Sequence, residues 1–76
     1  MMEPPLVGTF VVDTRDERLA RVHAVRNRRL YLRPPGGGTA DEWEAVPQHV
    51  RHTDAAEDLR ARVAVENARS VYGRGW

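Results

Sequence analysis

The sequence contains no cysteine and no lysine, and serine occurs only at Ser70. Without cysteine, a disulfide framework, a cysteine zinc site and a thiol nucleophile are all excluded. No apolar run approaches the roughly 20 residues that span a bilayer, and residues 1–5 lack the basic and then apolar pattern of a secretory signal. We therefore expect a cytoplasmic protein. With 76 residues, the chain has room for one small domain.

All twelve basic residues are arginine. Guanidinium groups suit carboxylate and phosphate recognition, but the same bias arises from a GC-rich genome, and the remaining composition follows that bias. The charge is unevenly distributed although the net charge is only +1. Residues 1–39 and 60–76 each carry a net +3, and residues 40–59 carry a net −5. Alternating blocks indicate charge complementarity within or between molecules, and they differ from the uniformly basic footprint of a nucleic-acid binder.

Short segments rich in β-branched and aromatic residues predict a strand-rich body. We expect strands over residues 6–12, 19–25, 29–33 and 42–45, and a last one near residue 50. Arg26-Asn27-Arg28 predicts a tight turn, because asparagine tolerates left-handed backbone. Such a small meander has to curl to bury one face, which favours an SH3-like barrel over residues 6–52. The predicted inward set is Val7, Phe10, Val12, Val22, Leu30, Leu32 and Trp43.

A helix is predicted over residues 53–72, after the barrel. We expect residues 1–5 to be disordered and the tail 73–76 to be flexible. Asp54 and Glu57 have the spacing of a capping box. The helix carries two apolar stripes about half a turn apart. Ala56, Leu59 and Val63 form one, and Ala61, Val65, Ala68 and Tyr72 form the other. Docking on the barrel needs one stripe, so the second, with Val65, indicates contact with another molecule. The competing interpretation is that its alanines merely favour helix formation.

Few residues have the spacing of a chemical site. His49, His52 and Asp54 form a weak candidate metal site, because H-x-x-H places two imidazoles on one side of a turn. Two solvated histidines are the more common outcome, so we expect no metal. Gly36-Gly37-Gly38 lacks the lysine of a phosphate loop. No nucleophile lies beside a base, and so small a barrel leaves little interior for a ligand. We therefore expect no enzyme, no cofactor and no small-molecule substrate.

One strand face alternates arginine and tyrosine, as small nucleic-acid-binding barrels do. It comprises Arg29, Tyr31 and Arg33, and Arg26 and Arg28 extend it. Glu42 and Glu44 occupy the like face of the following strand, where they would pair with the arginines across the sheet. The near-zero net charge favours this structural interpretation, because phosphate affinity depends on uncompensated positive charge.

Three segments carry a resemblance. Val11-Val12-Asp13-Thr14, Leu32-Arg33-Pro34-Pro35-Gly36-Gly37-Gly38 and Glu42-Trp43-Glu44-Ala45, followed by a helix closing in Glu66-Asn67-Ala68-Arg69-Ser70, resemble short uncharacterised proteins of Streptomyces and related actinobacteria. The resemblance covers about residues 6–70 and implies a source but no activity. The segment from Trp43 to Val50 is similar to the closing strands of SH3-like barrels, and the opening hairpin is similar to PRC-barrels; both are analogies of fold alone.

These observations predict a non-catalytic protein–protein interaction or regulatory module that forms a homodimer or binds another protein through its C-terminal helix. Below about 70–80 residues a single core gives little stability, and oligomerisation is a common remedy. The predicted interface residues are Leu59, Val63, Val65, Ala68, Tyr72 and Trp76, the last as a terminal aromatic anchor. The alternative is nucleic-acid binding through Arg26, Arg28, Arg29, Tyr31 and Arg33. No membrane partner is expected.

Overall fold

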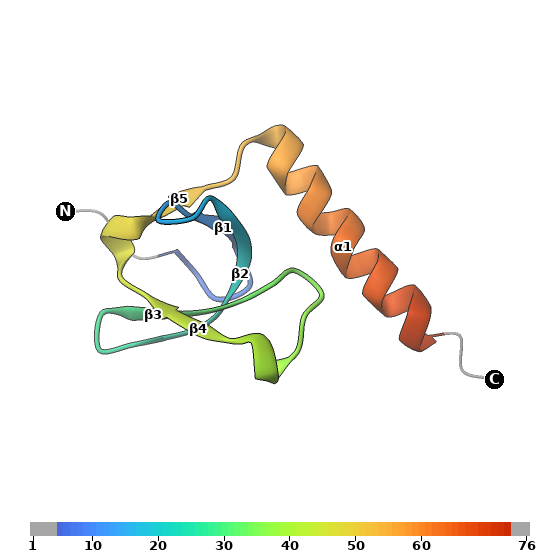
Figure 1. The fold of residues 1–76 in the computed structure, drawn as a ribbon, viewed down its shortest axis with the longest axis horizontal. Coiled ribbons are helices and arrows are strands. Elements are labelled where there is room, and N and C mark those ends of the chain that lie inside the picture. Colours follow the sequence, from blue (N-terminus) through green and yellow to red (C-terminus); the bar gives the residue numbers. More distant parts are fainter. Residues whose placement is uncertain (1–4, 74–76) are drawn as a thin grey trace.

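The computed structural model describes residues 5–73, with the backbone alone for Thr39 and residues 69–73. The elements, in chain order, are β1 (Phe10–Asp13), β2 (Arg18–Arg26), β3 (Arg29–Arg33), the 3₁₀ turn η1 (Thr39–Asp41), β4 (Trp43–Ala45), the 3₁₀ turn η2 (Pro47–His49), β5 (Val50–His52) and α1 (Ala55–Gly73). Figure 1 shows α1 as a single rod on one side of the sheet. Five antiparallel strands followed by one helix confirm this part of the predicted fold. The flexibility predicted for residues 1–5 and 73–76 concerns segments that lie almost wholly outside the described residues.

The sheet is open, so the prediction of a closed barrel is wrong. Its strand order is β4-β3-β2-β1-β5, which leaves β4 and β5 as the two edges. Both edge strands are only three residues long, and the single turn of η2 carries the chain from one edge to the other. Short edge strands offer few unpaired backbone groups to other chains.

The β2–β3 hairpin has the tight turn that the sequence predicts. Asn27 and Arg28 join the two strands and have φ values of 50° and 64°. Positive φ at both central residues is the requirement of a type I′ turn, whose twist matches that of the strands it connects. Further along the hairpin, a bulge between Val22 and Ala24 shifts the register by one residue, at His23.

The inner face of the sheet carries the core. Val22, Leu30 and Leu32 are fully buried there, as predicted, and Trp43 packs against them. In the first strand the predicted inward residues are wrong. Val11 belongs to the inner core, so Phe10 and Val12, which were predicted to point inward, lie on the other face. The core comprises Val11, Ala20, Val22, Leu30, Leu32, Ala45 and Val50.

The first strand also begins later than predicted. Thr9 N–H donates to the carbonyl of Leu6, and Gly8 adopts a φ of 93°. These features make residues 6–9 a turn, and Val7, predicted to point inward, is 63% exposed.

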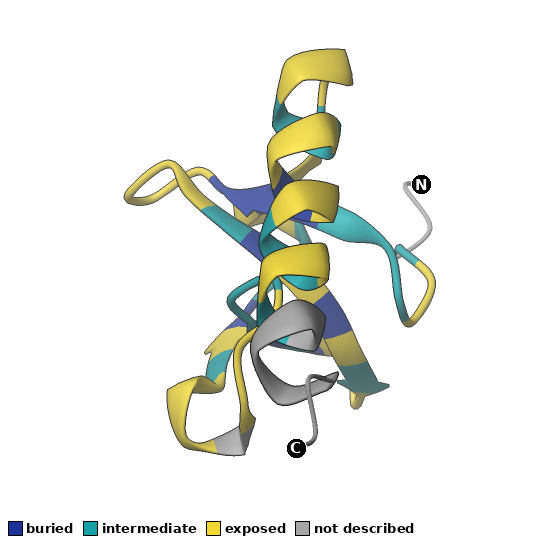
Figure 2. Ribbon diagram, turned by 90° about the vertical axis from the view of Figure 1, so that its right-hand side faces the viewer, coloured by how far each residue is buried: buried dark blue, intermediate teal, exposed yellow. Residues whose placement is uncertain are grey.

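Helix α1 packs against part of the outer face of the sheet, mainly at β2. Val12 lies opposite Arg51 in the ladder, and the Arg51 guanidinium binds Glu57 of α1, which identifies the side facing the helix. Val12 is 2% exposed although it lies outside the inner core, and Ala61 of α1 is 0% exposed. Figure 2 shows α1 crossing in front of the sheet with a largely exposed outer side. Within the described part of the chain, no helix is long and apolar enough to cross a membrane.

Candidate interaction surfaces

The outer side of α1 carries two large apolar residues that the fold leaves in solvent. Leu59 is 62% exposed and Val63 is 49% exposed. At 100° per residue both positions lie on the side of the helix opposite the buried Ala61. Ala56, one turn before, is exposed on the same side. We call these three residues the outer stripe.

The inner side of α1 is built from small residues. Ala61 is buried, and Ala64, Val65 and Ala68 are half-buried. A Cβ atom added to Gly36 would lie 2.8 Å from the Ala64 carbonyl oxygen and 3.0 Å from the Ala68 Cβ. The β3–η1 loop therefore touches the helix directly, and only small side chains on both partners allow so close an approach.

This packing changes the role expected of the stripe with Val65, whereas Leu59 and Val63 of the predicted interface stay exposed. The stripe containing Val65 and Ala68 faces the protein's own sheet, whereas Leu59 and Val63 are left for other contacts. Only the alanine-rich face of α1 can approach Gly36 this closely, so that face packs inward and the larger Leu59 side chain stays in solvent. The side chain of Tyr72 and the whole of Trp76, which complete the predicted interface, lie outside the described residues.

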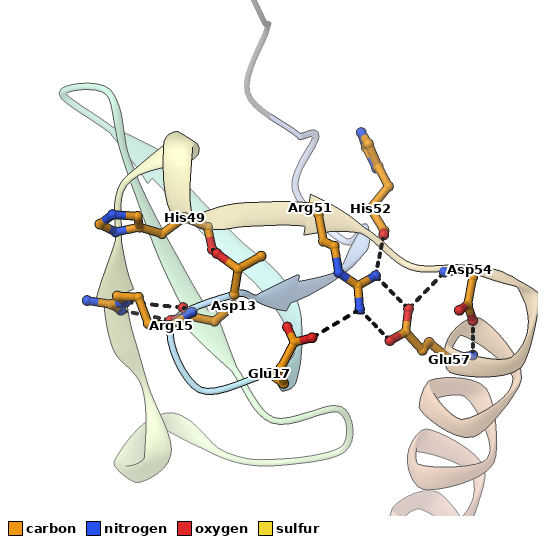
Figure 3. Close-up of polar contacts among 9 residues, drawn as sticks. Asp13, Arg15, Glu17, His49, Arg51, His52, Asp54 and Glu57 are labelled. Atoms are coloured by element: carbon orange, nitrogen blue, oxygen red, sulfur yellow. Dashed lines mark hydrogen bonds and ion pairs between the residues drawn. The ribbon is translucent and has the colours of Figure 1, made fainter.

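The N-terminal end of α1 is held by a polar cluster that Figure 3 shows. The Asp54 N–H donates to Glu57 Oε1 at 3.0 Å, and the Glu57 N–H donates to Asp54 Oδ1 at 2.8 Å, which confirms the predicted capping box. Arg51 of β5 donates to both Glu57 oxygens, at 2.8 and 2.7 Å. These bonds lower the pKa of Glu57 to about 2, first through Arg51 and then through the Asp54 N–H. Glu57 thus joins the sheet to the helix.

The arginine and tyrosine face is partly neutralised, as the cross-strand interpretation predicts. Arg29 lies 3.2 Å from Glu44, and Arg33 lies 3.2 Å from Glu42. The Tyr31 hydroxyl is 3.5 Å from the same Glu44 carboxylate. These carboxylates neutralise the charges of Arg29 and Arg33, and phosphate binding needs positive charge that is not neutralised.

Two arginines of the predicted nucleic-acid set keep their charge unpaired. Arg26 and Arg28 are exposed at the β2–β3 turn, and the structure gives neither a carboxylate partner among the side chains that it describes. Arg26 places its guanidinium 5.8 Å from the centre of the Tyr31 ring. Within the predicted nucleic-acid set, the unpaired positive charge therefore lies at the tip of this hairpin.

A buried carboxylate ends β1, one residue beyond the strand that the sequence predicts over residues 6–12. Asp13 is 1% exposed. It accepts hydrogen bonds from the Arg15 N–H at 3.0 Å, from Arg15 Nε at 3.1 Å, from Arg15 Nη2 at 2.7 Å and from Trp43 Nε1 at 3.0 Å. The bonds from Arg15 hold the pKa of Asp13 far below its ordinary value, against the opposing effect of burial. The Arg18 guanidinium covers Trp43, 3.9 Å from the ring centre.

We call the hydrogen-bonded contacts of Asp13 with Arg15 and Trp43 the clasp, because they hold three segments of the chain together. It joins β1, the β1–β2 loop and β4, and Arg15 Nη2 also donates to the Glu44 carbonyl at 3.2 Å. All four Asp13 contacts are satisfied within the chain, and no buried side-chain polar atom of the described residues lacks a partner. The described core therefore leaves no orphaned group for a ligand to satisfy.

The candidate metal ligands are not brought together. His49 ends η2, His52 ends β5, and Asp54 caps α1. In Figure 3 the two imidazoles point away from each other. Among the described residues, no group of three or more histidine, aspartate or glutamate side chains could hold a metal ion.

The surface also has one open depression that the sequence does not predict. It lies between the N-terminal segment, β2 and the β3–η1 loop, has a volume of about 340 Å³, and has Val7, Arg21, His23, Arg33 and Gly37 in its lining. The only sequence signal was an arginine and a histidine inside an otherwise apolar strand, at Arg21 and His23.

No family model, curated protein or solved structure matches the chain. Its function is therefore inferred from its own geometry.

Proposed function

We propose that the protein is a non-catalytic interaction module that self-associates through the outer stripe of α1. The observation that carries the proposal is the exposure of Leu59 and Val63 on the side of the helix opposite Ala61. Ala56, Leu59 and Val63 follow the i, i+3, i+7 spacing with which an amphipathic helix packs on a partner. Burying both would add apolar area to a domain whose own core is small.

A second copy fits this surface better than a strongly charged partner. The net charge is only +1, so two copies do not repel each other at long range. The outer stripe is flanked by both signs of charge, and Arg62 pairs with Asp58 within the helix at 3.0 Å. Antiparallel helices related by a two-fold axis midway between Leu59 and Val63 would place Leu59 of each copy against Val63 of the other. The patch is small, so we expect a weak, concentration-dependent dimer.

Sedimentation equilibrium from micromolar to millimolar concentration tests the proposal. We expect the parent chain to approach twice the monomer mass at high concentration, and Leu59→Glu to remain monomeric. Gln48→Glu is the matched control, because it introduces the same charge at an exposed site on η2. A parent chain that stays monomeric throughout, or a Leu59→Glu variant that associates like the control, contradicts the proposal.

A second candidate is nucleic-acid binding at the β2–β3 turn. Arg26 and Arg28 favour it, because the structure describes no carboxylate beside either one. Fluorescence anisotropy with single- and double-stranded probes at low salt tests it. Binding that weakens steeply with salt, and is reduced by Arg28→Gln, is the expected result for this candidate; no binding at low salt eliminates it.

We also propose that the strands are connected as in SH3-like domains, although the sheet does not close into a barrel. Its support is the short 3₁₀ turn between the last two strands, together with the pairing of the last strand with the first. The proposal concerns topology, and it assigns no activity.

A further inference from the structure

Two arginines lie opposite each other in the ladder of neighbouring strands, and no carboxylate among the described side chains pairs with both. Arg21 of β2 is the direct ladder partner of Arg33 of β3, so both side chains project from the same face of the sheet. Like charges directly opposite each other destabilise a sheet. Both residues line the open depression of about 340 Å³. An arrangement that is unfavourable in the empty protein becomes favourable when an anion lies between the two guanidinium groups.

Arg21 has spare hydrogen-bonding capacity. Its Nε donates to the Gly8 carbonyl at 3.3 Å, and its guanidinium lies 5.6 Å from the centre of the Phe10 ring. These contacts give the exposed side chain a direction. The structure gives it no carboxylate partner among the side chains that it describes. Its charge is therefore positioned and uncompensated, as an anion site requires.

Arg33 is held by contacts that orient it toward the same depression. Its Nε donates to Glu42 Oε1 at 3.2 Å, and its Nη2 lies 2.9 Å from His23 Nε2. A guanidinium has only donors, so a hydrogen bond in this contact needs His23 Nε2 as the acceptor, and the same nitrogen lies 4.0 Å from Glu42 Oε1. One carboxylate against two guanidinium groups leaves a positive charge at the depression.

The rest of the wall combines apolar surface with a fixed loop. The Gly37 N–H donates to the Pro34 carbonyl at 2.7 Å, and Gly36 between them has a φ of 77°, which makes a type II turn. Helix α1 packs against Gly36 and holds this turn in place. Val7 and Pro34 add apolar surface to the lining.

We propose that this depression binds the phosphoryl group of a small phosphate monoester. Two guanidinium groups on neighbouring strands approach a tetrahedral dianion from two directions, whereas one guanidinium fork satisfies a planar carboxylate. The volume accommodates a small organic group beside the phosphate, and Val7 and Pro34 provide its apolar contacts. The ligand is bound without being consumed, and its binding does not depend on self-association of α1.

Amide chemical-shift titration of the full chain with phenyl phosphate, inorganic phosphate and benzoate tests this assignment at constant ionic strength. We expect phenyl phosphate to move the amide signals of Gly8, Arg21 and Gly37 in a saturable manner, and to bind more tightly than inorganic phosphate. Benzoate should bind at least about tenfold more weakly than phenyl phosphate.

Arg21→Gln should weaken phenyl phosphate binding at least about tenfold, because it removes one of the two guanidinium groups. Arg60→Gln is the control, since it makes the same charge change at an exposed position of α1 that does not line the depression. Retained dispersion of the amide signals shows that a variant is folded. Equal binding by the two variants, equal binding of benzoate, or shifts that never saturate would each overturn the assignment.

Discussion

Replacement of Asp13 by asparagine tests the clasp at the end of the sheet. The side chain keeps its volume but loses its charge, and its new NH₂ group has to face a donor on Arg15 or Trp43. Hydrogen bonds to a charged group contribute about 1.5–3 kcal/mol each and neutral ones about 0.5–1.5 kcal/mol. The Arg15 side chain is 48% exposed and can turn to water, whereas Trp43 Nε1 and the Arg15 N–H remain close to the buried site.

The expected loss is therefore about 2 kcal/mol, a large part of the roughly 3–5 kcal/mol available to a domain of this size. With a urea dependence of about 1 kcal/mol per molar for a small domain, the unfolding midpoint should fall by about 2 M. Urea unfolding followed by circular dichroism measures it. Asp16→Asn is the control, because Asp16 is exposed in the adjacent loop and undergoes the same charge change. An Asp13→Asn midpoint equal to that of the control would refute the clasp.

Three further predictions concern α1. Gly36→Ala should lower the free energy of unfolding by about 1–3 kcal/mol, because φ is 77° and the added Cβ would meet the helix; Gly38→Ala has open space around it and should be nearly neutral in thermal unfolding. Val65→Asp should lower the melting temperature even in dilute monomer, because Val65 faces the sheet, and an unchanged melting temperature would contradict that placement. Bonds from Arg51 lower the pKa of Glu57 to about 2, so its stabilising contribution is complete above its ordinary pKa of 4.5 and is lost as the pH falls toward 2. The difference in melting temperature between the parent and Glu57→Gln should shrink over that interval, and a constant difference would argue against the ion pair.

The features that sequence reasoning found are those set by local chemistry. The capping box of Asp54 and Glu57 and the turn at Asn27 each depend on residues within three positions of one another. Leu30 and Leu32 alternate cleanly with polar neighbours, and this pattern predicts the face on which the core forms.

Alternation failed in the first strand, because that strand is buried on both sides. Val11 packs in the inner core and Val12 lies on the face where α1 packs. Because both residues are apolar, the sequence does not show which of them points toward the inner core. The choice between the two stripes of α1 depended on Gly36, a residue far from the helix in sequence. The clasp and the depression likewise depend on contacts between distant segments, such as Asp13 with Trp43 and Arg21 with Arg33.

The central claim is that α1 docks through its small residues and presents Leu59 and Val63 to a second copy. Isotope-filtered NMR on a millimolar mixture of labelled and unlabelled chains tests it most directly, because only contacts between copies give signals. We expect intermolecular contacts that join the methyl groups of Leu59 to those of Val63. Contacts that converge on Val65 instead, or no intermolecular contact at that concentration, would contradict the account.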